Sequence, residues 1–202
     1  MKTPIIDFSR SYTFSNYFDF PYELGEIVAE FGYSSTTAKL ELPRTNTDLD
    51  RIPTLQARIE ETIPFVSLTS EIARREMLIA PVLIDLIHYT QARLSIEYPL
   101  NVTEQLKGTL DYLLRSQGQM LIVEAKKADL DKGFIQLAVE LIALDQWVNS
   151  KEPILTGAVS TGSIWQFGQL HRESKQITQD LDFYTVPTNL NDLLRVLVAI
   201  LT

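Results

Sequence analysis

Residues 121–141, LIVEAKKADLDKGFIQLAVEL, contain the pattern from which the fold can be inferred. The apolar run from Leu121 to Val123 is typical of a buried strand, and it passes directly into Glu124 and Lys126. Side chains two positions apart on a strand point to the same face of the sheet. A charged pair on a buried strand costs free energy unless other groups pair with it. The stretch therefore predicts a strand whose end carries a polar site.

Helical and extended segments alternate on both sides of this strand. Residues 132–148, KGFIQLAVELIALDQWV, have the length and composition of a helix. The expected strands are Leu94–Pro99, Gly108–Arg115, Met120–Ala125, Ile154–Val159 and Ser163–Leu170. Further helices are expected at 16–31, 50–61, 70–88 and 190–201, with a short strand at 38–42. Pro81 should kink the helix at 70–88.

From residue 70 onward the expected order is α-β-β-β-α-β-β-α. This order predicts an α/β domain in which helices flank a mixed central sheet. A chain of 202 residues can form one such domain with an N-terminal elaboration. Because no glycine, serine or proline linker divides the chain, we expect the N-terminal part to pack on the rest.

The composition restricts the location and the chemistry. The chain has no cysteine, so disulfides and thiolate metal sites are excluded, and we expect a cytoplasmic protein. No apolar run reaches about 18 residues, so we expect no membrane association. No glycine-rich phosphate loop or dinucleotide fingerprint occurs. The net charge of −8 argues against a general nucleic-acid coat but does not exclude a local DNA site.

A second carboxylate is expected beside Glu124. Asp111 lies in GTLDYLL, the strand that precedes it, and the short Ser-Gln-Gly connection at 116–118 suggests a hairpin between the two strands. Two adjacent carboxylates repel each other unless a proton or a cation lies between them. Together with the Ala125 carbonyl they offer the oxygen ligands that Mg²⁺ prefers, with Mn²⁺ as the alternative. Lys126 beside them could orient a water or neutralise charge on a phosphate.

A third acidic residue is predicted on the helix at 70–88. Ile72 and Ile79 belong to an apolar stripe with helical spacing, and Glu76 falls in the middle of that stripe. A carboxylate on a buried face needs a partner, which a metal would supply. Glu71 is the competing choice, but its stripe contains Arg75 and is expected to face solvent, so Glu76 is preferred.

Together these features resemble the PD-(D/E)XK nucleases, whose fold is restriction-endonuclease-like. The resemblance rests on the order of Glu76, Asp111, Glu124, Lys126 and Gln136. It covers about residues 70–170, half of the chain. Gln136 is similar to the extra glutamine of the branch typified by restriction-enzyme and Holliday-junction-resolvase nuclease domains. The eponymous proline is absent, and leucine stands before the aspartate.

The resemblance implies a nuclease-like domain at 70–202 with an N-terminal α/β elaboration at 1–69, and Mg²⁺-dependent hydrolysis of DNA. Asp111 and Glu124 would hold the ion with the Ala125 carbonyl, and Glu76 would bind it directly or through water. Lys126 would position the attacking water, and Gln136 would steady Lys126 or the scissile phosphate. The opposing hypothesis is a non-catalytic module that keeps a nuclease-like fold to bind nucleic acid or a protein.

The C-terminal helix raises the question of assembly. Residues 193–201, LLRVLVAIL, are apolar nearly all round, with Arg195 as the only charge. Such a helix must bury more than one face, against either the N-terminal segment or a second subunit. Because cutting both strands of a duplex requires two active sites, we expect a homodimer, with the N-terminal segment as the competing cover.

Overall fold

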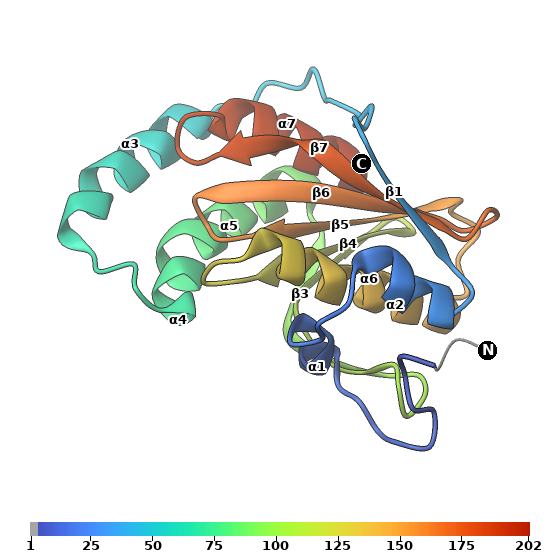
Figure 1. Ribbon diagram of the computed structural model, residues 1–202. Coiled ribbons are helices and arrows are strands. Elements are labelled where there is room, and N and C mark those ends of the chain that lie inside the picture. The colour runs from blue at the N-terminus through green and yellow to red at the C-terminus, as the bar shows by residue number, and fades with distance from the viewer. Residues whose placement is uncertain (1–3) are drawn as a thin grey trace.

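The computed structural model describes residues 4–202, and a single mixed sheet runs through this part of the chain (Figure 1). Its seven strands lie in the order β1-β7-β6-β5-β4-β3-β2. The strands are β1 Ser34–Ala38, β2 Arg93–Asn101, β3 Lys107–Ser116, β4 Gln119–Ala125, β5 Ile154–Ser160, β6 Ile164–His171 and β7 Gln176–Thr185. β1 and β7 are parallel, as are β4 and β5, and the other neighbours are antiparallel.

Helices cover both faces of the sheet (Figure 1). One face carries α1 (Phe14–Phe18), α2 (Leu24–Glu30) and α6 (Leu130–Trp147), and the other carries α3 (Ile52–Thr62), α5 (Ala80–Thr90) and α7 (Leu190–Leu201). A 3₁₀ turn η1 (Ile63–Phe65), a short helix α4 (Glu71–Arg74) and a π-helix η2 (Arg75–Ile79) connect α3 to α5. The prediction of an α/β fold with a mixed, helix-flanked sheet is therefore confirmed.

The central strand β4 is buried from both sides. Ile122 belongs to the apolar cluster under α6, whereas its neighbours Leu121 and Val123 belong to the cluster under α7. A strand covered by helices on both faces must be apolar at successive positions, because it has no solvent side. This explains why the run before Glu124 is continuous rather than alternating.

Several predicted elements differ from the structure. The helix expected at 16–31 is interrupted between α1 and α2, where Pro21 lacks the N–H that a helix interior requires. The strand expected at 38–42 is wrong, because the observed strand, β1, ends at Ala38. Strand β7 was not predicted, although it joins β1 to β6. The helix at 70–88 is divided by the π-helix η2, which immediately precedes Pro81 and its neighbour Ala80.

The C-terminal helix α7 is covered within the chain. It contacts α5, α3 and the sheet, and the segment at 40–47 lies along it. Arg195 Nη1 donates to the carbonyls of Thr45, at 2.9 Å, and Thr47, at 3.3 Å. The N-terminal segment thus supplies the cover, and the apolar helix no longer argues for a second subunit. Among the described residues, no helix has the length and apolar character needed to cross a membrane.

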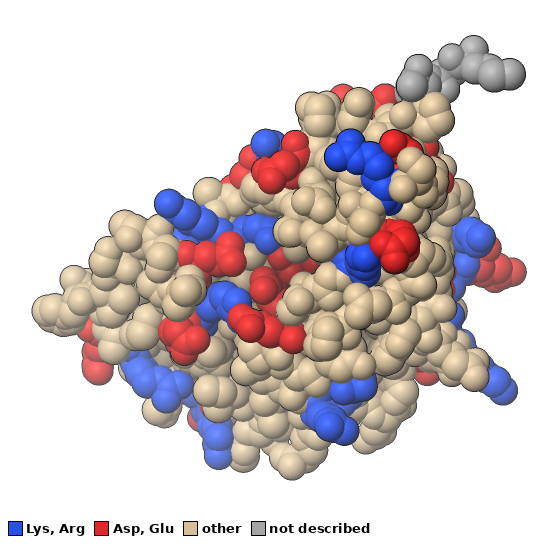
Figure 2. Space-filling model, turned by 90° about the horizontal axis from the view of Figure 1, so that it is seen from below, with Lys and Arg blue, Asp and Glu red and all other residues tan. Residues whose placement is uncertain are grey.

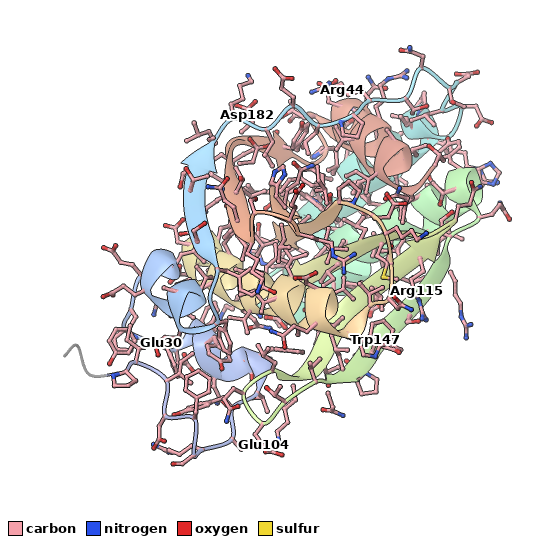
Figure 3. The ribbon with its side chains drawn as sticks, turned by 90° about the vertical axis from the view of Figure 1, so that its right-hand side faces the viewer. Glu30, Arg44, Glu104, Arg115, Trp147 and Asp182 are labelled. Atoms are coloured by element: carbon pink, nitrogen blue, oxygen red, sulfur yellow. The ribbon has the colours of Figure 1, made fainter. Side chains whose placement is uncertain are left out.

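An aromatic and cationic cluster lies at the C-terminal end of β3, where Figure 3 shows Arg115 and Trp147 near each other. The Arg115 guanidinium lies 5.2 Å from the centre of the Tyr98 ring, and Tyr98 in turn packs edge-on against Trp147 at the end of α6. Cation–π and edge-to-face aromatic contacts of this kind stabilise neighbouring elements. The cluster joins β2, β3 and α6 away from the carboxylates.

Candidate active site

The hairpin of β3 and β4 brings Asp111 to the end of β4. The two strands are antiparallel with Tyr112 opposite Val123, so Asp111 and Glu124 occupy the next positions along each strand. The Asp111 Oδ2 accepts a hydrogen bond of 2.8 Å from the Ala125 N–H. The structure therefore places both predicted carboxylates on one side of the sheet, under α6.

Glu124 is almost fully buried, with 1% of its surface exposed. Its Oε1 accepts from the Lys126 Nζ, which also forms an ion pair with it, and from the Gln136 Nε2 at 2.6 Å. Its Oε2 has no hydrogen-bond partner among the described residues. The structure thus brings Glu124, Lys126 and Gln136 together, and Glu140 lies close enough to hydrogen-bond with Glu124 when one of the two carboxyls carries a proton.

A residue that the sequence analysis missed, Glu140, extends this cluster into the core. It lies one turn after Gln136 on α6 and is fully buried. The Gln136 Nε2 donates to Glu140 Oε1 at 2.9 Å, so one amide group bridges two carboxylates. The signal in the sequence was an amide and a carboxylate four residues apart inside an otherwise apolar helix, where both side chains must share a face.

Burial and mutual repulsion control the protonation of these carboxylates. Burial, and then the Asp111 charge, raise the pKa of Glu124 to about 7, although Lys126 opposes the shift. Burial and the Glu124 charge raise the pKa of Glu140 well above its ordinary value. Burial favours a lower pKa for Lys126, but Glu124 outweighs it, and the pKa of Lys126 is raised. The raised pKa values favour the charged form of Lys126 and the protonated forms of Glu124 and Glu140 more strongly than in freely exposed side chains.

Local backbone geometry lets α6 approach Lys126 closely. Asp129, in a left-handed conformation, caps α6 by accepting a 3.1 Å hydrogen bond from the Lys132 N–H. Gly133 follows in the first turn, where a Cβ would lie 2.8 Å from a Val159 methyl and 2.9 Å from Lys126 Cγ. The absence of a side chain at Gly133 therefore allows the helix to pack on the end of β4.

The segment predicted as a helix at 70–88 brings residues other than Glu76 to the carboxylate cluster and the cavity beside it. Glu76 was expected on the buried face, but it is exposed, as is Ile72, because the π-helix changes which side chains face the core. No hydrogen bond or ion pair joins Glu76 to the cluster within the described part of the chain. Glu71, the competing choice, lines the cavity beside Lys126 and Gln136.

Arg75 contacts the cluster from the same helix. Its Nη1 lies 3.5 Å from Asp111 Oδ1, and its Nε donates to the Tyr112 hydroxyl at 3.3 Å. The guanidinium also lies 5.1 Å from the centre of the Tyr112 ring. The sequence analysis had assigned Arg75 to a solvent-facing stripe, yet its side chain is only 14% exposed.

A cavity of about 500 Å³ is lined by Lys126, Gln136 and Glu71, among other residues. Helix α1 forms one of its walls with Phe18, whose ring centre lies 5.4 Å from Lys126 Nζ and 5.9 Å from Lys132 Nζ. Figure 2 shows the molecule from the side of α1 and α4, where acidic side chains gather at a hollow with basic side chains around them. A ligand in the cavity would therefore meet Lys126 and Gln136, which separate it from the buried Glu124.

A divalent cation fits part of this donor set. The unpartnered Glu124 Oε2 and the neighbouring Asp111 carboxylate are hard-oxygen donors, and Ala125 stands between them. Mg²⁺ typically needs only one or two protein carboxylates because it keeps several waters. Among residues 4–202, no group of three or more Asp, Glu, His or Cys side chains is arranged to hold a metal. The donor set consists of two carboxylates, a number that suffices for Mg²⁺ only if water molecules complete its coordination.

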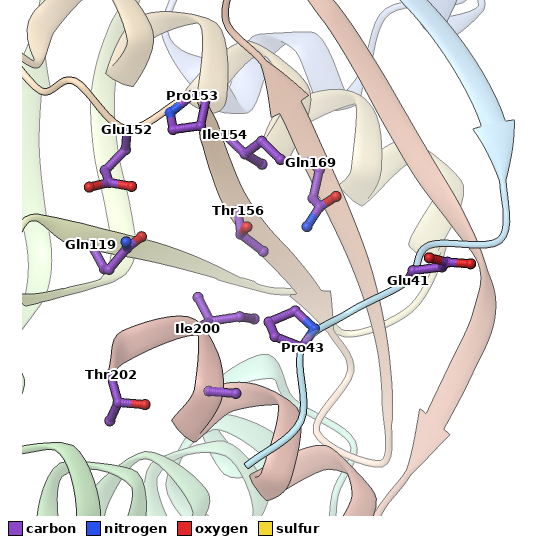
Figure 4. Close-up of a pocket in the computed structure, with 11 residues that line it drawn as sticks. Glu41, Pro43, Gln119, Glu152, Pro153, Ile154, Thr156, Gln169, Ile200 and Thr202 are labelled. Carbon is purple, nitrogen blue, oxygen red and sulfur yellow. The ribbon is translucent and has the colours of Figure 1, made fainter.

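A second cavity, of about 330 Å³, lies at the opposite end of β5 (Figure 4). Its lining includes Glu41, Glu152, Gln119 and Thr156, with Ile200 of α7 as an apolar wall. It has no lysine or arginine in its lining and no buried unpartnered carboxylate. This cavity therefore offers fewer groups suited to catalysis than the cavity beside Lys126.

Comparisons with family models, with curated proteins and with solved structures found no match for this chain.

Proposed function

We propose that this chain is a Mg²⁺-dependent nuclease that hydrolyses DNA phosphodiester bonds and has a restriction-endonuclease-like core. The observation that supports the proposal is the convergence of Asp111, Glu124, Lys126 and Gln136, with Glu124 Oε2 buried and unpartnered. A buried carboxylate with a free oxygen costs free energy, and a cation offsets that cost. These four are among the five residues on which the resemblance to PD-(D/E)XK nucleases rests; the fifth, Glu76, is exposed.

Two carboxylates and one backbone carbonyl would hold the cation. Asp111 and Glu124 supply the carboxylates, and Ala125 supplies the carbonyl. When bound, Mg²⁺ would supply positive charge that stabilises the negative charge accumulating on the phosphate. Glu71 replaces Glu76 in the proposal as the third acidic residue, because it lines the cavity whereas Glu76 is exposed.

Lys126 and Gln136 act on the substrate side of the cluster. The Lys126 side chain is 13% exposed and lines the cavity, so its ammonium group can hold the attacking water or donate to the scissile phosphate. Gln136 donates to Glu124 and so fixes the carboxylate in one orientation. This arrangement keeps Glu124 Oε1 occupied and Oε2 available.

Protonation of Glu124 sets the pH range. Its pKa of about 7 means that the carboxylate still carries a proton in much of the metal-free population at neutral pH. Since a ligating carboxylate must lose its proton, binding of Mg²⁺ should release protons and weaken below pH 7. Cleavage should therefore rise between pH 6 and pH 8.

Two substitutions test the roles separately. Asp111→Asn should abolish Mg²⁺ binding in calorimetry, because it removes a negative charge from a site with few carboxylates. Lys126→Ala should keep Mg²⁺ binding but reduce cleavage by about 10³-fold. Lys175→Ala is the matched control, because Lys175 also lies over an aromatic ring, that of Tyr33. This variant should cleave DNA like the parent. If Asp111→Asn and Lys126→Ala both cut DNA at the parental rate, the nuclease proposal is wrong.

A second candidate function is a non-catalytic module that binds nucleic acid or a protein. It is favoured by the acidic pI of about 4.8 and by the lack, within residues 4–202, of three or more acidic or histidine side chains arranged around a metal. Calorimetry separates the two candidates, because a non-catalytic module should show no heat of binding with millimolar Mg²⁺.

The homodimer prediction now rests only on the need for two sites to cut a duplex, and light scattering tests it against the 23.0 kDa monomer.

A further inference from the structure

Arg75 holds a position that the catalytic proposal does not use. Its Nη1 lies 3.5 Å from Asp111 Oδ1 and 3.4 Å from Glu97 Oε1. Glu97 is 67% exposed, so water screens that contact, whereas the Asp111 side chain is only 17% exposed. The stronger of the two interactions is therefore with the carboxylate that would hold the cation.

Both oxygens of Asp111 are occupied in the metal-free protein. The Ala125 N–H donates to Oδ2, and the Arg75 guanidinium lies beside Oδ1. A cation at Asp111 would stand close to the positive charge of Arg75, and two like charges at this separation repel each other. Arg75 and a divalent cation therefore compete for the same carboxylate.

The arginine is anchored independently of Asp111. Its Nε donates to the Tyr112 hydroxyl at 3.3 Å, and its plane lies over the Tyr112 ring, 5.1 Å from the ring centre. Its Nη2 donates to no described residue. Its backbone begins the π-helix η2, a type of distortion that often occurs at functional sites. A small tilt of the rigid guanidinium about the Nε contact with Tyr112 can therefore bring its Nη groups to another acceptor.

We propose that Arg75 exchanges partners during the reaction: it neutralises Asp111 in the metal-free protein and donates from its Nη edge to the DNA phosphate once the cation is bound. This inference rests on the proposed function. A guanidinium suits the second role because its parallel N–H donors match two phosphate oxygens. Arg75 then keeps the empty site neutral and adds positive charge where the substrate binds.

Substitutions at Arg75 should change metal binding and cleavage in opposite directions. Arg75→Ala should bind Mg²⁺ about tenfold more tightly in calorimetry, because a competing cation is removed. The same variant should cleave DNA about 10²–10³-fold more slowly, because a donor to the transferred charge is lost. Arg75→Lys keeps the charge but not the paired donors, so its Mg²⁺ affinity should stay close to the parent while its cleavage falls.

Arg115→Ala is the matched control. Arg115 lies on the same strand as Asp111 and covers the Tyr98 ring at 5.2 Å, much as Arg75 covers Tyr112. It contacts no carboxylate among the described residues and donates to Ser95 Oγ at 3.2 Å. We expect its removal to leave both Mg²⁺ affinity and cleavage unchanged.

The outcomes distinguish this inference from the proposed function. Tighter Mg²⁺ binding with slower cleavage in Arg75→Ala supports the exchange of partners. Unchanged or weaker Mg²⁺ binding in that variant, or a parental rate of cleavage, overturns it while the nuclease proposal stands. If Arg75→Ala does not fold, Arg75→Lys decides: parental cleavage by that variant overturns the exchange. If the parent itself binds no Mg²⁺, the proposed function fails, and the exchange fails with it.

Discussion

Helices α6 and α7 cover opposite faces of the same sheet, yet they bury different kinds of side chain. The buried residues of α7 are all apolar, and its single positive charge, Arg195, reaches the carbonyls of a surface segment. The twelve buried residues of α6 include Gln136 and Glu140, and the other ten are apolar or glycine. Both helices have buried leucines that anchor them, so packing alone does not account for the polar pair in α6.

The polar pair in α6 lowers stability rather than raising it. Gln136 and Glu140 each have one buried side-chain oxygen without a partner among the described residues. A buried polar group in that state typically costs 1–3 kcal/mol, and replacing such groups by apolar ones is often neutral or stabilising. The α7 face of the sheet is therefore packed with apolar side chains alone, whereas the α6 face accommodates ionisable groups at a cost in stability.

The largest expected effect on stability tests whether both helices are anchored equally. Leu197→Ala in α7 and Leu141→Ala in α6 remove fully buried side chains. Each should lower the free energy of unfolding by about 2–5 kcal/mol, because each leaves a cavity. Urea denaturation measures both, with Leu181→Ala, an exposed leucine, as the control that should change little. If Leu141→Ala lowers the free energy of unfolding by less than half as much as Leu197→Ala, polar contacts take the place of apolar packing in anchoring α6.

The next effect concerns the buried charge itself. Glu140→Gln keeps an acceptor for Gln136 but removes an ionisable group, so in the metal-free protein at pH 8 it should raise the free energy of unfolding by on the order of 1–3 kcal/mol. Glu61→Gln, on the exposed surface of α3, is the control that should have no such effect. A destabilised Glu140→Gln variant would mean that the carboxylate holds the fold together.

The dependence of stability on pH gives an independent measure of the same charge. Because the pKa values of Glu124 and Glu140 are raised in the folded protein, the folded state binds more protons than the unfolded state above about pH 4.5. Stability from this pair is therefore greatest at low pH and is lost for Glu124 as the pH rises to about 7. Denaturation in EDTA between pH 5.5 and 8 should show a shallower decline for Glu140→Gln than for the parent. Identical slopes would exclude this explanation.

The sequence predicts the α6 side of the molecule well at short range. The run before Glu124 and the Asp111 strand gave β3 and β4 within about one residue, because both the hairpin connection and the apolar pattern are local. The resemblance assigned Gln136 to Lys126 or the scissile phosphate, whereas in the structure Gln136 donates to Glu124 and Glu140. Glu140 was missed because its spacing of four residues from Gln136 shows that the two share a helix face, but not that this face packs against Glu124.

Other parts of the fold depend on information that a local pattern lacks. Strand β7, QITQDLDFYT, pairs with β1, which precedes it by about 140 residues, and its buried Asp180 accepts from the Leu40 N–H. Neither contact is visible in a window of sequence. The choice of Glu76 over Glu71 assumed a regular helical period, and a π-helix adds a residue to the turn and changes the face. The face of that helix that turns towards the core was therefore predicted incorrectly at Glu76.

The smallest expected effect tests the one charge of α7. Arg195→Ala removes two hydrogen bonds to the carbonyls of Thr45 and Thr47, so it should lower the free energy of unfolding by about 1 kcal/mol. Arg44→Ala, which breaks a more exposed ion pair with Asp192, should have a still smaller effect. Because neither arginine contacts the cluster under α6, Mg²⁺ affinity measured by calorimetry should be parental in both variants. A change in Mg²⁺ affinity on removal of Arg195 would mean that the two faces of the sheet are coupled, and that the separation between a stabilising face and a charged face does not hold.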